Sequence, residues 1–485
     1  MKLQELLQPW IDSSLPDCDI LGLQNDSRHV RLGDLFIAYP GAVADGRRYI
    51  AQAHQSGARA ILYDPVQFPE DVVLPSTIPC IPFPQLVEQL AAVASRFYHD
   101  PSEKMSIVGV TGTNGKTTIA YQLAQAHQLL GRPSVYMGTL GYGQVPNLES
   151  LNNTTPDALQ VQRLLFTHLQ AGFSQMCMEV SSHALDQHRV DHIRFQEAIY
   201  TNLSHEHLDY HQTMTAYLQA KASLFAKSGL EWVILNQDDD YVQQIAAVVP
   251  KGVRQWTYGI HKPADVRAVD YQLFSHSSQF TVESPWGRHA VTTPSLGLFN
   301  IYNSLAVYTS LLAHGYPVQS VIEIMENLTG TPGRMEIVAH KPYVIVDFAH
   351  TPAALDNVMK TIVSLKASEQ VKIWVVFGCG GNRDKAKRPL MAKVVCEQAD
   401  YVVVTSDNPR HEDPEAIICD IATGLVPNAA VTTLVDRREA IRYALSSAGS
   451  EDIVLIAGKG HENYQIIGDE HLHFSDQEEV RQFFS

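Results

Sequence analysis

The 485-residue sequence contains no apolar run that approaches the roughly 18–20 residues a helix needs to cross a bilayer. Its first segment, MKLQELLQP, carries acid and amide groups where a secretory signal would need an apolar stretch. The six cysteines form no Cys-x-x-Cys pair, which favours free thiols in a reducing compartment. We therefore expect a cytoplasmic protein without membrane insertion.

Positive charge is also scarce. The chain has 36 Lys and Arg against 52 Asp and Glu, a formal net charge of −16. Nucleic acids and anionic membranes would be repelled over most of such a surface, so we expect neither as a partner. A small anion held in a local basic pocket is compatible with this balance. Apolar residues make up 45% and charged residues 18%, proportions typical of a folded globular protein.

The length of the chain exceeds what one hydrophobic core usually organises, and its pattern divides into three blocks. We expect one domain in each of the ranges 1–98, 99–333 and 334–485. The first block is typical of mixed α/β structure, with strands expected at 33–40 and 58–63. A polar stretch that contains a proline, residues 99–104, is the expected linker to the second block.

Strands and helices alternate through the second and third blocks. The expected strands lie at 106–110, 176–180, 198–201, 232–235, 343–346, 372–377, 401–405 and 453–457. Such alternation predicts an α/β fold whose sheets are mostly parallel and covered on both faces. Residues 265–292 break the pattern, because their short alternating strands predict an antiparallel patch. In parallel sheets, ligands gather at the carboxyl ends of the strands.

A glycine-rich turn between a strand and a helix is the most informative local motif. Glycines let backbone N–H groups approach phosphate oxygens, and the helix N-terminus adds positive potential. GVTGTNGKTT (residues 109–118) therefore predicts a nucleotide site, although Val110 stands where the strict P-loop spacing has glycine. We expect Lys116 to reach the β- and γ-phosphates and Thr117 to offer its hydroxyl to Mg²⁺. The full predicted loop comprises Gly112, Thr113, Asn114, Gly115, Lys116, Thr117 and Thr118.

Two further segments suggest metal ligands. Glu179 ends the expected strand 176–180, where a P-loop protein places a metal-binding acid. Residues 201–211 contain three histidines and two acids, so a zinc centre on His205, His207 and His211 is one hypothesis. Hard oxygen ligands and an accompanying nucleotide favour Mg²⁺ instead. For His205 and His211, ordinary polar loop contacts are the preferred interpretation.

Together these motifs resemble the Mur ligase family, ATP-dependent amide-forming enzymes of bacterial cell-wall synthesis. The resemblance covers nearly the whole chain, and its motifs occur in the family order. They are TGTNGKTT (111–118), NTTP (153–156), MEVSSH (178–183), HLDYH (207–211), PGRME (332–336), AHTP (349–352), DNPR (407–410) and GKGHE (458–462). The implied fold is an N-terminal substrate domain, a central ATPase domain and a C-terminal Rossmann-like domain.

The resemblance also implies roles for individual residues. ATP and Mg²⁺ would be the cofactors, with Asn300 and Arg334 completing the ATP site. Lys221 matches the family's carbamylated lysine, which would support a Mg²⁺ shared with His207; without the family, Lys221 would be interpreted as an exposed helix residue. Catalytic roles then fall on Lys116, Glu179, His207 and Lys221. The UDP-muramoyl-dipeptide would contact Asn25, Ser27, Asn153, Thr154, Thr155, Ser181, Gln187 and Arg189.

The DNPR run accompanies meso-diaminopimelate in the family. A guanidinium can bind the distal carboxylate of that amino acid through two parallel hydrogen bonds, which lysine as substrate could not offer. The expected reaction is ATP-dependent ligation of meso-2,6-diaminopimelate to UDP-N-acetylmuramoyl-L-alanyl-D-glutamate through an acyl phosphate, in peptidoglycan precursor synthesis. We expect a monomer with these small-molecule substrates. The expected diaminopimelate residues are Arg383, Asp407, Asn408, Pro409, Arg410, Gly458 and Glu462.

Two departures from the family pattern accompany this resemblance. Glu206 must replace an aspartate before HLDYH, and residues 40–44 read PGAVA where the family often has Gly-x-His-Gln-Ala. Substrate contacts from the side chains of Ala42 and Val43 are therefore doubtful. Three alternatives stay open: a folate polyglutamate or other Mur-type ligase, a P-loop regulator that hydrolyses nucleotide, and the zinc hydrolase.

Overall fold

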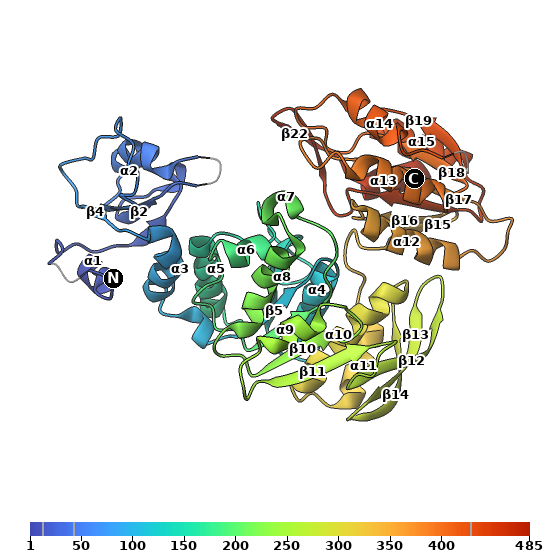
Figure 1. The fold of residues 1–485 in the computed structure, drawn as a ribbon, viewed down its shortest axis with the longest axis horizontal. Coiled ribbons are helices and arrows are strands. Elements are labelled where there is room, and N and C mark those ends of the chain that lie inside the picture. The colour runs from blue at the N-terminus through green and yellow to red at the C-terminus, as the bar shows by residue number, and fades with distance from the viewer. Residues whose placement is uncertain (12–13, 42–43, 427–428) are drawn as a thin grey trace.

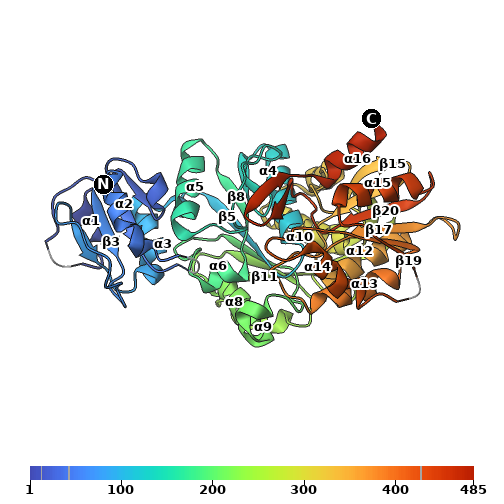
Figure 2. The same cartoon turned by 90° about the horizontal axis from the view of Figure 1, so that it is seen from above.

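The computed structural model describes residues 1–11, 14–41, 44–426 and 429–485; Ala42 and Val43 lie outside the described residues. Three successive units follow one another along the chain, each built around its own sheet. Figures 1 and 2 both show the N-terminal and C-terminal units at opposite ends of the molecule, with the central unit between them. Within the described ranges, no helix is both long and apolar enough to cross a bilayer.

The N-terminal unit is a four-stranded parallel sheet in the order β1-β2-β3-β4. All five residues of β2 are buried, as expected for a strand covered on both faces. The strands are β1 (Gly22–Gln24), β2 (Asp34–Ala38), β3 (Ala60–Tyr63) and β4 (Cys80–Pro82). The helical segments are α1 (Leu3–Leu7), η1 (Ser27–His29), η2 (Gly46–Tyr49), α2 (Ile50–Gln55), α3 (Leu86–Phe97) and η3 (Pro101–Glu103).

The central unit contains a ten-stranded sheet in the order β14-β13-β12-β11-β10-β9-β5-β8-β6-β7. Its interior is parallel, while β12, β13 and β14 pair antiparallel, which confirms the antiparallel patch expected from the sequence. The strands are β5 (Ser106–Thr111), β6 (Ser134–Gly138), β7 (Gly141–Gly143), β8 (Gln175–Glu179), β9 (Glu197–Tyr200), β10 (Trp232–Asn236), β11 (Arg254–Gly259), β12 (Val266–Leu273), β13 (Ser278–Ser284) and β14 (Gly287–Thr293).

Helices cover both faces of this central sheet. Successive side chains of β5 alternate between two cores: Val108 packs in the core formed with α4 and α10, and Ile107 packs in the core formed with α5. The carboxyl end of β5, which leads into the glycine-rich turn, therefore lies near the middle of the sheet. The helices are α4 (Lys116–Leu129), α5 (Ala158–Gln170), α6 (Ser182–Asp186), α7 (Leu208–His211), α8 (Met214–Ala222), η4 (Ser223–Ala226), α9 (Val242–Ala247), α10 (Leu298–Ala313) and α11 (Val318–Asn327).

The C-terminal unit has a six-stranded sheet in the order β15-β16-β20-β17-β18-β19, parallel except for the β15–β16 pair. The strands are β15 (Glu336–His340), β16 (Tyr343–Asp347), β17 (Ile373–Phe377), β18 (Tyr401–Val404), β19 (Ala430–Thr433) and β20 (Ile453–Ala457), with a hairpin of β21 (Tyr464–Ile467) and β22 (Glu470–His473). The helices are α12 (Pro352–Ser364), α13 (Lys387–Cys396), α14 (Pro414–Ala422), α15 (Arg437–Ser447) and α16 (Asp476–Phe484). The predicted α/β fold with mostly parallel sheets is confirmed.

Candidate active site

The turn between β5 and α4 requires two of its glycines. Gly112 has φ +148°, and a Cβ there would overlap Thr201 Oγ1. Gly115 has φ +87°, and a Cβ there would lie 2.5 Å from Asn303 Oδ1. Only glycine fits such close approaches and positive φ values without strain. The loop thus packs directly against the end of β9 and against α10.

Lys116 opens α4 and folds back over this loop. Its ammonium donates hydrogen bonds to the carbonyls of Gly112, at 2.9 Å, and Thr113, at 2.7 Å. Loss of hydration lowers the pKa of Lys116, although the carboxylates of Glu179 and Glu206 act in the opposite direction. These two carbonyls are weak partners for a cation, and a phosphate would be a stronger one.

Glu179, at the end of β8, is fully buried beside this loop. Its carboxylate accepts hydrogen bonds from Thr117 Oγ1 at 3.0 Å, Thr139 N at 2.8 Å, Thr139 Oγ1 at 3.2 Å and Tyr136 Oη at 2.5 Å. All of these donors are neutral, and among the described residues no cation lies within ion-pair distance of Glu179. A buried carboxylate beside a P-loop hydroxyl is the hard oxygen set that suits Mg²⁺.

Lys221 lies at the carboxyl end of α8 and is 1% exposed. Its ammonium donates a 2.7 Å hydrogen bond to the carbonyl of Gly112 and lies 4.6 Å from the centre of the Tyr217 ring. Burial, followed by the charge of Lys116, lowers the pKa of Lys221 well below its usual value. The interpretation of Lys221 as an exposed helix residue is wrong, because its surroundings come from segments distant in sequence.

His207 and Glu206 lie between the central and C-terminal units. Glu206 is 3.8 Å from His207 Nε2 and 3.9 Å from His350 Nε2, two groups from different units. Burial alone would raise the pKa of Glu206, but His207, His350, Lys116 and Lys221 together lower it. The side chain of His207 is 42% exposed, and partial loss of hydration lowers the pKa of its imidazole, with the charges of Lys116 and Lys221 acting in the same direction. Glu206 stays the predicted replacement for the aspartate of the family pattern.

The structure does not support a zinc centre on the neighbouring histidines. His211 is buried with Nε2 2.9 Å from Ser182 Oγ, whereas His205 is exposed. Over the described ranges, no group of three His, Cys, Asp or Glu side chains is arranged to hold a metal.

Four of the residues expected to bind the dipeptide form one hydrogen-bonded group at the ends of β8 and α6. Thr155 Oγ1 donates to Glu179 O at 2.9 Å and accepts from Ser181 N at 3.1 Å. Arg189 donates to Thr155 O at 2.9 Å and to Gln187 Oε1 at 3.0 Å. Of the other two expected residues, Thr154 is half-buried and Asn153 is exposed.

The two residues expected to hold the uridine nucleotide lie in the N-terminal unit. Ser27 donates a 2.8 Å hydrogen bond to Gln52 Oε1, and Asn25 donates a 3.1 Å hydrogen bond to Tyr39 Oη. Burial raises the pKa of Tyr39, and the guanidinium of Arg189 opposes that shift. Both residues therefore make these hydrogen bonds within the N-terminal unit.

Asn300 and Arg334 flank the glycine-rich turn from α10 and from the start of the C-terminal unit. Asn300 is buried and accepts a 2.8 Å hydrogen bond from Asn303, which contacts Gly115. Arg334 donates to Thr117 Oγ1 at 3.1 Å, and its guanidinium carbon lies 4.5 Å from the centre of the Phe348 ring.

A second polar group lies at the carboxyl ends of β17, β18 and β20. Arg410 has φ +53° and donates to Gly381 O at 3.0 Å. A Cβ on Gly380 would lie 3.0 Å from Arg410 Nη1 and 3.8 Å from Arg383 Cγ, so the two side chains are neighbours. Burial, followed by the charge of Arg383, lowers the pKa of Arg410. Across the described parts of the chain, neither arginine forms an ion pair with an acid. The carboxylates of Asp407 and Glu462 act in the opposite direction on Arg410, but neither lies within ion-pair distance of it. Two neighbouring guanidinium groups without a direct ion-pair partner are suited to a carboxylate.

The acids of this group lie beside the arginines. Asn408 Nδ2 donates to Glu462 Oε2 at 2.8 Å, and a Cβ at Gly458 would lie 2.6 Å from Asp407 Oδ2. Asp407 and Asn408 are buried, and Pro409 is buried between them and Arg410.

Comparison with known proteins gives these sites a context. Three family models match consecutive parts of the chain: the Mur ligase family catalytic domain at 19–98, the Mur ligase middle domain at 110–311 and the Mur ligase glutamate ligase domain at 333–460. A protein of Alkalilimnicola ehrlichii named UDP-N-acetylmuramoyl-L-alanyl-D-glutamate–2,6-diaminopimelate ligase is 43% identical, with 99% of this chain and 98% of that protein covered. The chain belongs to the Mur ligase family. It is an ATP-dependent ligase that forms amide bonds.

Other relatives of this Mur ligase carry the same name or share its fold. A Coxiella burnetii protein of the same name is 42% identical, with 99% of this chain and 98% of that protein covered. A solved structure bearing this name is 35% identical, with a TM-score of 0.71 and coverage of 100% of this chain and 98% of that chain. The MurF ligase of Thermotoga maritima, solved in complex with ADP, is 16% identical with a TM-score of 0.65 and shares the fold; the match covers 96% of each chain.

Several residues of the candidate site were not predicted from the sequence. Tyr136 and Thr139, which bind Glu179, follow no motif in the sequence. Asn303 is one helical turn after Asn300, so the three-residue spacing could have indicated it. Lys459, inside the GKGHE motif, is fully buried among Asp407, Asn408 and Glu462 and was not assigned a role.

Proposed function

We propose that this Mur ligase joins meso-2,6-diaminopimelate to UDP-N-acetylmuramoyl-L-alanyl-D-glutamate at the expense of ATP, by way of an acyl phosphate. The names of relatives at 42–43% identity support this reaction. The observation that carries the choice of amino acid is the pair of neighbouring guanidinium groups of Arg383 and Arg410. Among the described residues, neither forms an ion pair with an acid, and Glu462 lies near them. The distal end of diaminopimelate bears a carboxylate and an ammonium, and this couple and this acid are complementary to both.

The three units divide the substrates among them in this proposal. Residues 1–98 bind the uridine nucleotide, 99–333 bind ATP and the dipeptide, and 334–485 bind the amino acid. Asn25 and Ser27 hold the nucleotide. The dipeptide side is formed by Asn153, Thr154, Thr155, Ser181, Gln187 and Arg189. The ATP side is formed by residues 112–118 with Asn300 and Arg334. The amino-acid side is formed by Arg383, Asp407, Asn408, Pro409, Arg410, Gly458 and Glu462.

The chemistry begins with the free side-chain carboxylate of the D-glutamyl residue, which is a poor electrophile. The carboxylate attacks the γ-phosphorus of ATP, the bond to the β-γ bridging oxygen breaks and ADP leaves. In this step Lys116 transfers its hydrogen bonds from the loop carbonyls to phosphate oxygens and neutralises charge there. The backbone N–H groups of 112–118 provide further donors.

The second step forms the amide. The diaminopimelate amine attacks the acyl carbon, and the tetrahedral intermediate loses inorganic phosphate and a proton. Thr117, Glu179, His207 and a carbamylated Lys221 would hold Mg²⁺, which would supply positive charge at the transferring phosphate. The imidazole of His207 fits a ligand role in its neutral form, which the lowered pKa of His207 favours.

Carbamylation of Lys221 fits the surroundings of that residue. Only a neutral amine attacks CO₂, and the carbamate forms with release of one proton. Burial beside Lys116 lowers the pKa of Lys221 and so favours the neutral amine. The product is an anion, which would replace repulsion between two lysines by attraction.

Oligomeric state and location complete the proposal. A monomer holds the complete set of assigned residues in one chain. A cytoplasmic location follows from the ATP and the nucleotide-linked substrate that the reaction consumes.

The test is phosphate release from ATP in the presence of UDP-N-acetylmuramoyl-L-alanyl-D-glutamate, compared between meso-diaminopimelate, L-lysine and no amine. Diaminopimelate should stimulate release strongly, and L-lysine should not. Lys116→Ala should abolish product, while the exposed control Lys393→Ala should retain it. Equal turnover with L-lysine would refute the assigned amino acid, and release independent of any amine would refute the ligase reaction.

A further inference from the structure

Lys459 is a buried lysine at the centre of the proposed amino-acid side. The residue is fully buried, and its ammonium donates to Asn408 Oδ1 at 3.1 Å and to Glu462 Oε2 at 3.1 Å. Asp407 Oδ1 lies 4.0 Å away. One ammonium thus contacts three residues assigned to the substrate, while its own burial keeps it from reaching that substrate.

The hydrogen bonds of Asn408 leave its amide only one orientation. Its Oδ1 accepts from Lys459 and, at 3.0 Å, from Ile466 N, while its Nδ2 donates to Glu462 Oε2 at 2.8 Å. Reversing the amide would place its NH₂ group against two donors. Glu462 Oε2 therefore accepts from two donors, whereas Oε1 accepts no hydrogen bond from the residues that the structure describes and can face the substrate.

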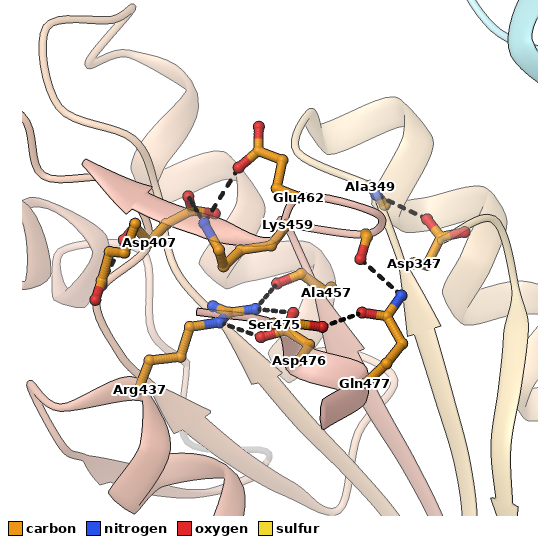
Figure 3. A network of polar contacts seen from close by, with 12 residues as sticks. Asp347, Ala349, Asp407, Arg437, Ala457, Lys459, Glu462, Ser475, Asp476 and Gln477 are labelled. Atoms are coloured by element: carbon orange, nitrogen blue, oxygen red, sulfur yellow. Dashed lines mark hydrogen bonds and ion pairs between the residues drawn. The ribbon is translucent and has the colours of Figure 1, made fainter. Parts of the chain in front are cut away.

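A second buried ion pair fixes the chain beneath Lys459. Arg437 and Asp476 are fully buried and form two 2.7 Å hydrogen bonds, and Arg437 also donates to Ala457 O at 3.1 Å. Ala457 ends β20 and is two residues before Lys459. Figure 3 shows Lys459 between Asp407 and Glu462, with the Arg437–Asp476 pair beneath it. The Arg437–Asp476 pair therefore fixes the backbone that leads to Lys459.

We propose that Lys459 is a positioning residue, which orients Asn408 and Glu462 so that Glu462 receives the distal ammonium of the amino-acid substrate. This role rests on the proposed function. Because Lys459 acts through its neighbours, its loss should weaken binding of the amino acid and leave binding of ATP and of the UDP-linked substrate nearly unchanged.

The charge of Lys459 predicts a pH dependence of substrate binding that a purely structural role would not produce. Glu462 faces the cations Lys459, Arg410 and Arg437, the carboxylate of Asp407 and the phenol of Tyr464. Burial raises the pKa of Glu462, and Lys459 is the strongest opposing influence. Without the lysine, Glu462 should hold a proton up to higher pH, and a protonated acid binds an ammonium poorly.

The experiment compares steady-state kinetics of the full chain with Lys459→Met between pH 6 and pH 9. We expect KM for meso-diaminopimelate to rise by about 10- to 100-fold at pH 7, the range typical of losing a residue that orients a ligand-binding group. The rise should shrink as pH increases, because Glu462 regains its charge. KM for ATP should change by less than about twofold. Lys459→Arg keeps the charge, so the ratio of its KM for meso-diaminopimelate to that of wild type should not depend on pH. Lys393→Met is the exposed control.

The possible outcomes separate this inference from the proposed function. An unchanged KM for diaminopimelate, or an equal rise of KM for all three substrates without pH dependence, would overturn the role of Lys459 alone. Wild-type protein without diaminopimelate-dependent turnover would overturn both. If Lys459→Met does not fold, as judged by circular dichroism, Lys459→Gln replaces it with the same expectation, since it also lacks the charge.

Discussion

Lys221 Nζ donates a 2.7 Å hydrogen bond to the carbonyl of Gly112, although the two residues are 109 positions apart. The same carbonyl accepts a 2.9 Å hydrogen bond from Lys116. Two ammonium groups therefore share one neutral acceptor in a buried place. Burial, followed by the neighbouring charge of Lys116, disfavours the charged form of Lys221, and its pKa is lowered for that reason. A carbamate at Lys221 would remove one of the two cations and release the Gly112 carbonyl.

The first prediction concerns that lysine. Lys221→Met should lower kcat by about 100-fold or more, the scale of losing a group that stabilises charge in a transition state. Wild-type protein incubated with ¹³C-bicarbonate should show a carbamate carbon resonance that is missing from the variant. Lys360→Met, on an exposed part of α12, is the matched control and should keep both activity and resonance. Full activity of Lys221→Met would contradict the assignment.

The second prediction concerns the amino-acid side. Arg410→Lys keeps a positive charge but cannot form two parallel hydrogen bonds to a carboxylate. KM for meso-diaminopimelate should rise about 30-fold or more, which corresponds to roughly 2 kcal/mol at 25 °C. Steady-state kinetics measure the change. Arg481→Lys, at an exposed site on α16, should behave as wild type. A KM that Arg410→Lys leaves unchanged would argue that the distal carboxylate lies elsewhere.

The third prediction concerns Glu179. Glu179→Gln retains the shape of the side chain and removes its charge, so Mg-ATP-dependent phosphate release should fall by about 100-fold or more. The melting temperature should change by about 3 °C or less, because the partners of this carboxylate are neutral donors rather than cations. Glu326→Gln on α11 is an exposed control. Wild-type rates in Glu179→Gln would exclude the carboxylate from the phosphate step.

Local patterns were sufficient for much of the fold. The strand predicted at 453–457 is β20 to the residue, and the strand predicted at 106–110 is β5 but for one residue at its end. Both strands are short and largely apolar, and polar or glycine residues follow or precede them, so their ends are visible in the sequence. The glycine-rich turn is equally local, since a strand, four loop residues and a helix start are adjacent.

The parts that the sequence could not predict depend on distant contacts. The burial of Lys221 results from packing of α8 against the loop after β5, and a lysine at the end of an isolated helix carries no sign of it. Lys459 is flanked by glycines, a context that also describes an exposed turn. Its burial depends on Asn408, which is 51 positions earlier. For both lysines the burial is visible in the structure and not in the residue type or its neighbours in sequence.

A last prediction concerns stability far from the ligands. Glu197, at the start of β9, is fully buried; its carboxylate accepts a 3.1 Å hydrogen bond from Ser310 and lies 3.3 Å from His314. Burial raises the pKa of Glu197 to about 7, and burial lowers the pKa of His314 to about 4, so the histidine offers no charge near neutrality.

The direction of the pH effect follows from these values. A carboxyl group whose pKa is raised by folding stabilises the folded protein fully when the pH is below its unfolded pKa, near 4.5. This contribution is lost as the pH rises through the folded pKa, about 7. Glu197→Gln keeps the hydrogen bond and cannot ionise. Its free energy of unfolding relative to wild type should therefore increase between pH 5 and pH 8.5, by about 3 kcal/mol at most. Urea unfolding across this range measures the difference, with the exposed Glu323→Gln as control. A difference that is independent of pH would show that Glu197 is ionised throughout.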